Sequence, residues 1–183
     1  MTEELPPGTP SFAMWNAAAF RERQEVQRRS YLRAATSMLY DRGIIQPYHY
    51  DVLAIARNFL DSNMDDIAVI VAQTACEVAT ENVLSGLLQH HRLPAVFEPW
   101  VKDGIRRGDI SDRRVLSLYR ALSGDDSITK EPFWEPYRKH VNARNRVVHQ
   151  GAHVSRQEAS DSCDIALKLI RHFETVLARM NAT

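Results

Sequence analysis

The chain has 183 residues, the length of one domain or of one domain with an appendage. Hydrophobic residues make up 44% and charged residues 25%, a composition typical of a soluble globular protein whose core needs no disulfides or structural metals. The 23 basic and 23 acidic residues balance, which excludes the strong overall positive field of an avid, non-specific nucleic-acid binder.

The cysteines and the first residues bear on the compartment. Cys76 and Cys163 lie in helical patterns without the spacing of a metal site or a disulfide framework, which fits a reducing environment. Residues 1–10 are rich in proline, so we expect them to be disordered. They also lack an apolar core, so they are not expected to form a signal peptide. No run approaches the roughly 18 apolar residues of a membrane span. The sequence therefore predicts a cytoplasmic protein without membrane contact.

Residues 11–46 have a helical but uneven pattern. Apolar residues cluster at both ends of this segment and flank a polar middle, "RERQEVQRRS". Gly43 and Pro47 interrupt the pattern before the next helix. We therefore predict an N-terminal helical arm over 11–46, with a polar middle that bridges solvent and ends that dock on this or another subunit.

Two helices are expected next. The first begins near Tyr48 and runs through "DVLAIARNFLDS". The second lies in "MDDIAVIVAQTACEVATENVLSGLLQHH" and ends before Pro94. Two neighbouring rows at helical spacing predict a wide buried stripe on this second helix. The rows are Ile67, Val71, Thr74, Val78 and Glu81, and beside them Ile70, Ala75, Ala79, Val83 and Leu87.

A short, loosely defined piece around residues 96–105 precedes two further helices. The helix in "SDRRVLSLYRALSG" is expected to be capped by Ser111 and stopped by Gly124. The helix in "PFWEPYRKHVNARNRVVHQG" is expected to start near Pro136 and to end just before Gly151.

The last helix opens with Ser155-x-x-Glu158, the pattern of a capping box, and continues to about Met180. Its apolar row keeps the helical period, and no segment has a convincing period of two. The prediction is an all-α fold, an up-and-down bundle of five or six helices over residues 47–183, with the N-terminal arm outside it.

The segment "ARNRVVHQG", residues 143–151, places Arg144 and Asn145 one turn before His149. Spacing alone carries no information, because two other arginine–histidine pairs occur at similar spacing. Those two pairs, Arg42/His49 and Arg146/His153, span a glycine, and the first also spans a proline. Only Arg144 and His149 lie in an uninterrupted helical stretch, about 140° apart on an ideal helix.

Two interpretations of this segment stay open on local chemistry. Residues 132–156 have a surplus of basic residues and three histidines, which would suit a phosphate backbone. Cations are also stabilising near a helix C-terminus, where a histidine is often a cap. The segment is therefore either a phosphate site or an ordinary charged helix end.

An Arg-Asn-x-x-x-His motif near the end of a late helix, followed by glycine, resembles the signature of the HEPN superfamily of small all-α bundles. The stretch "ARNFLDSNMDDIAVIVAQTACEVATENVLSGLL" is similar to the long paired helices that open many of these domains. The closing "SRQEASDSCDIALKLIRHFETVL" resembles the last helix of the family. The resemblance spans roughly residues 48–180 and leaves out the arm.

The resemblance implies a metal-independent endoribonuclease without cofactors, a toxin, stress or phage-defence component that acts as a homodimer. His149 would move protons, Arg144 would clamp the developing charge, and Asn145 would hold His149 or the phosphate. Glu77 could orient Arg144, although a paired core carboxylate is an equal alternative, and His140 is a further supporting candidate.

Four basic residues are the expected contacts to RNA phosphates: Arg138, Lys139, Arg146 and Arg156. A separately encoded antitoxin or effector protein could act as a regulator, because no such domain is fused to the chain. The alternative hypothesis is a catalytically inactive helical module that binds RNA or a partner protein.

Overall fold

The structure is a computed structural model, and it describes residues 47–92 and 108–182. The predicted disordered residues 1–10, the arm at 11–46 and the short piece around 96–105 lie outside the described residues. Residues Pro47–Thr183 form a compact unit of their own, to which all the elements below belong.

The described residues fold into five α-helices and one short 3-10 helix, with no strand among them. The α-helices are α2 (Tyr48–Asp61), α3 (Asp65–His90), α5 (Arg113–Ser123), α6 (Trp134–Gln150) and α7 (Arg156–Asn181), and the 3-10 helix is η1 (Ile128–Lys130). The all-α prediction is confirmed.

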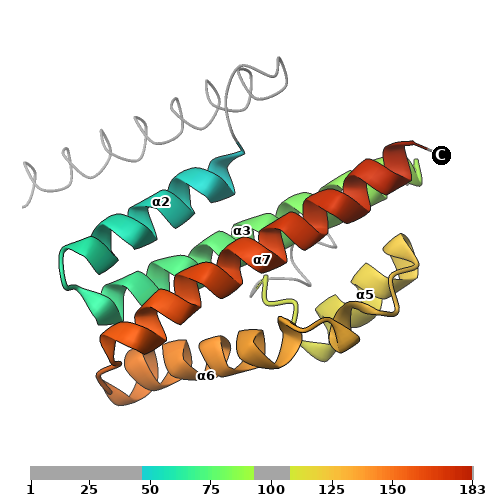
Figure 1. The fold of residues 1–183 in the computed structure, drawn as a ribbon. Helices are drawn as coiled ribbons and strands as arrows, with labels where there is room; N and C mark the ends of the chain where they lie inside the picture. Colours follow the sequence, from blue (N-terminus) through green and yellow to red (C-terminus); the bar gives the residue numbers. More distant parts are fainter. Residues whose placement is uncertain (1–46, 93–107, 183) are drawn as a thin grey trace, which may run out of the picture. The chain divides into compact units, whose positions relative to one another are not determined.

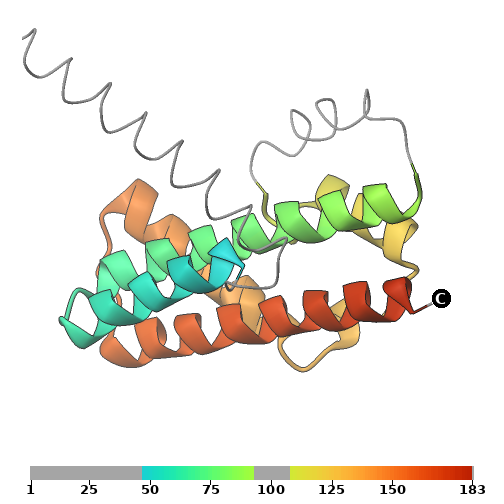
Figure 2. The ribbon, with the colours of Figure 1, turned by 90° about the horizontal axis from the view of Figure 1, so that it is seen from above.

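Helices α3 and α7 are the two long helices of the bundle, and they run side by side in the same direction (Figures 1 and 2). Helices α2 and α6 run in the opposite direction along this pair, and α5 lies near its C-terminal end (Figure 1). Helix α3 packs against α2, α5, α6 and α7, which makes it the central element of the fold.

Helix α3 buries one of the two predicted rows, at Ala75, Ala79, Val83 and Leu87, but most of the other row is not buried. In the first predicted row, Ile67 is 37% exposed and Thr74 and Glu81 are also exposed, whereas Val71 is partly buried and packs against the core. The buried face combines alanines with a few larger residues: Ala68, Val69, Ala72, Ala75, Cys76, Ala79, Val83 and Leu87. Small side chains on this face let the neighbouring helices approach α3 closely, which the apolar pattern did not specify.

Helix termini follow local sequence signals, with one correction. The N-cap of α5 is Asp112 rather than the predicted Ser111, because Asp112 Oδ1 accepts a hydrogen bond from the Arg114 amide at 2.8 Å. Gly124 ends α5 in the left-handed conformation, as predicted. The capping box at the start of α7, Ser155 with Glu158, is present. Each of these caps satisfies backbone groups that a helix end leaves unpaired.

Helix α3 bears on the expectation that no segment could span a membrane. By length and composition alone, α3 is apolar enough to cross one. A buried core helix passes the same test, and 56% of its most apolar window is buried inside the bundle. The composition of α3 is explained by its central place in the fold.

Candidate functional site

The candidate site lies at the C-terminal end of α6, where the helix stops directly after His149 and Gln150. Gly151 adopts a left-handed conformation with φ of 63°, and its amide donates to the Val147 carbonyl at 3.1 Å. Glycine is the residue that enters this conformation without a steric penalty. The predicted helix stop is confirmed, and it places the last turn of α6 at the surface.

The three motif residues differ in exposure. Arg144 is half-buried, whereas Asn145 and His149 are exposed. Arg144 Nη1 donates a hydrogen bond to Asn145 Oδ1 at 3.2 Å. Within the described ranges, no hydrogen bond joins His149 to either of these residues. One chain thus brings Arg144 and Asn145 together but leaves His149 apart, as their separation around the helix implies.

Three of the four predicted phosphate contacts form ion pairs with carboxylates. The pairs are Arg138 with Glu135 at 3.2 Å, Arg146 with Glu158 at 3.0 Å and Arg156 with Asp65 at 3.1 Å. Lys139 is exposed, and the described part of the chain places no carboxylate within 4.0 Å of it. Acidic residues of α3 and α7 therefore offset part of the local basic surplus that the sequence predicts.

The loop that follows α6 is held against the start of α3. Asp66 accepts the Val154 amide at 2.8 Å through Oδ1 and pairs with His153 Nδ1 at 2.6 Å through Oδ2. The hydrogen bonds from Val154 and His153 lower the pKa of the Asp66 carboxyl. Asp66 therefore fixes the chain only a few residues beyond the exposed His149.

Polar residues also line the contact between α3 and α6, and we call Gln73, Glu77, His140 and Arg144 the α3–α6 seam. Gln73 Nε2 donates to Glu77 Oε1 at 3.2 Å. Burial raises the pKa of Glu77, against the opposing effects of the Gln73 hydrogen bond and the Arg144 charge. No ion pair joins Glu77 to Arg144 in the described structure. The described residues therefore show no direct contact through which Glu77 would orient Arg144.

His140 belongs to the interior of the seam. Its side chain is buried, with 4% exposure, and neither ring nitrogen has a protein hydrogen-bond partner. Burial, together with the positive charge of Arg144, lowers the pKa of His140 to about 4. His140 is therefore a neutral imidazole near the guanidinium, and its side chain does not reach the surface.

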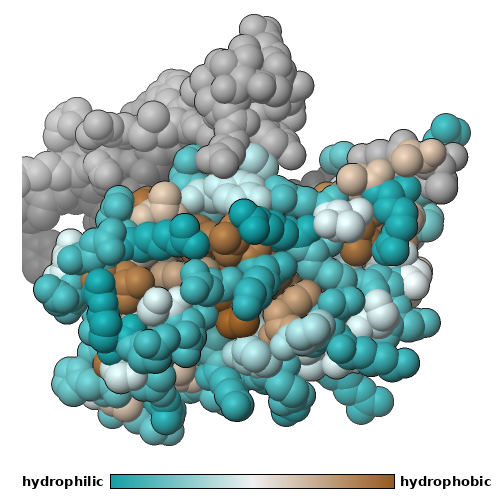
Figure 3. All heavy atoms as spheres, viewed as in Figure 1, coloured by the Kyte–Doolittle hydropathy of each residue, from teal (hydrophilic) through white to brown (hydrophobic). Residues whose placement is uncertain are grey.

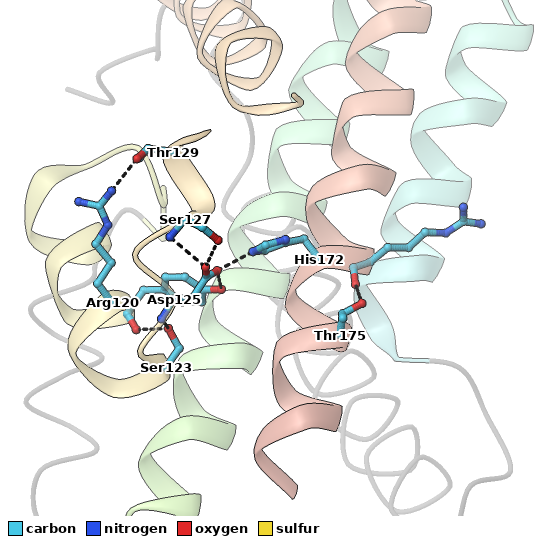
Figure 4. Close-up of polar contacts among 9 residues, drawn as sticks. Arg120, Ser123, Asp125, Ser127, Thr129, His172 and Thr175 are labelled. Carbon is cyan, nitrogen blue, oxygen red and sulfur yellow. Dashed lines mark hydrogen bonds and ion pairs between the residues drawn. The ribbon is translucent and has the colours of Figure 1, made fainter. Parts of the chain in front are cut away.

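A polar network that the sequence did not reveal centres on Asp125, which is 5% exposed (Figure 4). Its carboxylate pairs with His172 Nε2 at 2.7 Å and accepts the hydroxyl groups of Tyr119 and Ser127, both at 2.8 Å. These hydrogen bonds outweigh burial and lower the pKa of Asp125. The network joins α7 to the loop between α5 and η1, and the Ser127 hydroxyl donates to Asp125 rather than to His172. The network therefore has a structural role, because it holds α7 and this loop together.

A second unforeseen network joins α2 to α3 and α7. Tyr50 donates its hydroxyl to Glu174 at 2.7 Å, and His49 Nε2 lies 3.8 Å from the same carboxylate. His49 Nδ1 lies 3.3 Å from the Asn82 amide nitrogen. Burial and the hydrogen bond to Glu174 raise the pKa of Tyr50 to about 12. Sequence spacing could not find this network, because its members come from three helices.

Comparisons with known proteins do not add to these observations. No family model matches the chain, and no curated protein or solved structure matches it either. Among the described residues, no group of three or more histidine, cysteine, aspartate or glutamate side chains could hold a metal ion.

Proposed function

We propose that the chain is a metal-independent endoribonuclease of the HEPN type, with Arg144, Asn145 and His149 acting on RNA. The observation that supports this proposal is the arrangement at the end of α6. The Arg144 guanidinium is held by Asn145 at 3.2 Å, one turn before a histidine exposed on the last turn of the helix. Such a surface offers a guanidinium and an exposed imidazole on the last two turns of one helix.

These groups suit attack of an RNA 2′-hydroxyl on the adjacent phosphorus. One imidazole accepts the 2′-hydroxyl proton, and a proton donor protonates the departing 5′-oxygen. The products are a 2′,3′-cyclic phosphate and a 5′-hydroxyl end. Arg144 would bind the phosphorane oxygens in a bidentate manner and stabilise the charge that develops there.

The proposed active species is a homodimer. A single chain supplies one exposed His149, and its Arg144 is turned partly into the bundle. A two-fold axis near the end of α6 would place a second histidine and a second arginine at the same scissile bond. Val148, beside His149, is 44% exposed and offers apolar surface for such a contact.

RNA phosphates would compete with the carboxylates that hold the predicted basic contacts. The pairs of Arg138, Arg146 and Arg156 involve exposed side chains, and exposed ion pairs contribute only about 0–1 kcal/mol. A phosphate can therefore replace the carboxylate at small cost. Binding through these residues and Lys139 would weaken steeply as salt rises.

The test is cleavage of a mixed RNA pool in EDTA by wild type and His149→Ala. We expect the wild type to leave 2′,3′-cyclic phosphate ends, and we expect the variant to lose at least about 100-fold in rate. His90→Ala is the matched control, because His90 is also an exposed histidine at the end of a helix. Equal cleavage by the two variants, or intact RNA with wild type, would contradict the proposal.

A second candidate is a catalytically inactive helical module that binds RNA or a partner protein. The ion pairing of Arg138, Arg146 and Arg156 favours it, because these side chains already have protein partners. A folded dimer that leaves RNA intact in the same assay would support this candidate. For both candidates we propose a cytoplasmic setting and a separately encoded antitoxin or effector protein as regulator.

A further inference from the structure

Buried polar atoms without a protein partner are concentrated in the α3–α6 seam. In the described residues they include Gln73 Oε1, both ring nitrogens of His140 and Arg144 Nε. Gln73 is 2% exposed and His140 is 4% exposed, so bulk solvent reaches neither side chain. Native proteins leave few buried polar atoms unpaired because each one is costly. Four such atoms in one seam point to a shared partner.

The residues that carry these atoms are linked across one helix contact. Helix α6 packs against α3, and Gln73 is tied to Glu77 on α3 by the hydrogen bond at 3.2 Å. His140 and Arg144 lie one turn apart on the same face of α6. The Arg144 charge lowers the pKa values of both Glu77 and His140, so the guanidinium lies near both groups.

The unpartnered atoms have a balanced set of hydrogen-bonding roles. Gln73 Oε1 is an acceptor, and a neutral imidazole contributes one donor and one acceptor. Arg144 Nε contributes a donor only. The two nitrogens of one imidazole ring point away from each other, so one water cannot bond to both. The four atoms therefore need at least two waters, each of which donates twice and accepts twice.

We propose that the α3–α6 seam encloses ordered water shared by Gln73, His140 and Arg144, and that Gln73 and His140 are thereby positioning residues for the Arg144 guanidinium. The inference rests on the proposed function only where it gives Arg144 a part in catalysis. The water and the positioning are properties of the fold.

Water suits the seam better than an ion does. Arg144 and Glu77 carry opposite charges that already compensate each other near the seam, so a neutral molecule needs no further counter-charge there. Buried waters in proteins typically make about three hydrogen bonds to polar groups that have no other partner. The seam supplies such groups from two helices, so a bound water would also tie α6 to α3.

The consequence for Arg144 is a fixed orientation. An arginine side chain loses considerable rotamer freedom when it is held in one conformation. Water at Nε would hold the buried edge of the guanidinium, while Nη1 contacts Asn145 at the surface. The guanidinium would then already be oriented when a phosphate binds, which lowers the entropic cost of binding.

A double-mutant cycle tests the shared water. Gln73→Met and His140→Leu each replace one partner with an apolar side chain of similar size. We expect each change to lower the urea midpoint of the full chain, because it leaves the other partner unsatisfied. The double variant should lose less than the sum of the two shifts.

The cycle gives a different result if the seam contains no shared water. If the imidazole has no partner at all, removing this buried polar group in His140→Leu raises the midpoint, and the two shifts add. Gln73→Met combined with His172→Leu is the control cycle, because His172 pairs with Asp125 in a separate network. That control should be additive.

The positioning of Arg144 has its own readout, exchange of its Nε proton with solvent measured by NMR. We expect slow exchange in wild type and faster exchange in Gln73→Met and His140→Leu. His140→Gln keeps a donor and an acceptor, so it should restore slow exchange. Slow exchange that persists in His140→Leu would overturn the positioning role.

These measurements separate the inference from the proposed function. Additive shifts and unchanged exchange overturn the inference even if the protein cleaves RNA. A coupled cycle in a protein that leaves RNA intact overturns the proposed function alone. In an active enzyme, His140→Leu should lower kcat with little change in KM, and His140→Gln should recover it.

Discussion

His172 and His140 are both largely buried imidazoles on neighbouring helices, but their ring nitrogens meet different surroundings. His172 Nε2 lies 2.7 Å from a carboxylate that two hydroxyl groups also contact (Figure 4). Neither nitrogen of His140 has a protein partner. The polar groups of the Asp125 network are hydrogen-bonded to one another, whereas the α3–α6 seam contains polar groups that need a further partner.

The difference indicates two uses of buried polarity. A network whose groups are paired with each other makes the fold specific and rigid at that place. A cluster with unpaired groups has capacity for water or a ligand, and it surrounds the one motif residue that is half-buried, Arg144. The face of the described residues that Figure 3 shows is mostly hydrophilic.

The largest expected effect comes from breaking the Asp125 network. Asp125→Ala leaves the hydroxyl of Tyr119 and Nε2 of His172 without their acceptor in a buried place. We expect the free energy of unfolding to fall by about 3–5 kcal/mol, measured by urea unfolding. Asp126→Ala is the control, because Asp126 is exposed, and its effect should stay within about 0.5 kcal/mol. A small loss of unfolding free energy in Asp125→Ala would mean that the network contributes little to the stability of the fold.

Local signals let the sequence predict much of the fold. The capping box Ser155-x-x-Glu158 and the glycine stops at Gly124 and Gly151 act over a few residues, so reading them needs no tertiary structure. The start of α5 shows the limit of such signals. Ser111 and Asp112 are both good caps, and only the backbone decides between them.

The periodicity predicted only part of the buried face of α3, the row of Ala75, Ala79, Val83 and Leu87. The helix is apolar on most sides, so several rows satisfy the 3.6-residue period equally well. Ala68, Ala72 and Ala75 form part of the buried face because they let neighbouring helices come close, whereas the larger Ile67 stays partly outside. Close packing decides between rows that hydrophobicity leaves equal.

Only the features of the site that depend on α6 alone could be predicted from the sequence. The motif predicted the helix stop at Gly151 and the separation of Arg144 from His149, since both follow from α6 alone. The burial of His140 depends on α3, and the pairing of Asp125 with His172 joins residues 47 positions apart. Such contacts carry no signal in the spacing of a single sequence.

A second prediction concerns the effect of acid on the stability of the α3–α6 seam. The pKa of His140 is lowered from 6.5 to about 4 in the folded protein. Above pH 6.5 both states are neutral at this residue and stability is unaffected. Between about pH 6.5 and 4 the unfolded chain binds a proton that the folded chain does not, so stability falls by about 3 kcal/mol on acidification.

The measurement is the difference in unfolding free energy between wild type and His140→Gln at several pH values. His140→Gln cannot bind the proton, so the variant should gain on wild type by about 3 kcal/mol from pH 7 to pH 4. The carboxylates whose pKa values are lowered, such as Asp66 and Asp125, lose stability in both proteins and cancel in the difference. A difference that is flat with pH would mean that the folded protein binds a proton at His140 as readily as the unfolded chain does.

The smallest expected effect compares one glycine from each region. Gly108 and Gly124 both have positive φ, 44° and 65°, so alanine is strained at either position. A Cβ at Gly124, next to the Asp125 network, would meet nothing within 4 Å. A Cβ at Gly108 would lie 3.1 Å from Glu77 Cβ and 3.2 Å from the Glu77 carbonyl oxygen, against the seam.

Backbone strain alone should therefore set the cost of Gly124→Ala, at about 1 kcal/mol. Gly108→Ala adds a steric clash with α3 and should cost about 1–2 kcal/mol more, measured by urea unfolding of both variants. Because the clash displaces Glu77, Gly108→Ala should also speed exchange of the Arg144 Nε proton, which Gly124→Ala should leave unchanged. Equal costs and equal exchange would mean that the segment at Gly108 moves away freely, and that the seam does not depend on its contact with Glu77.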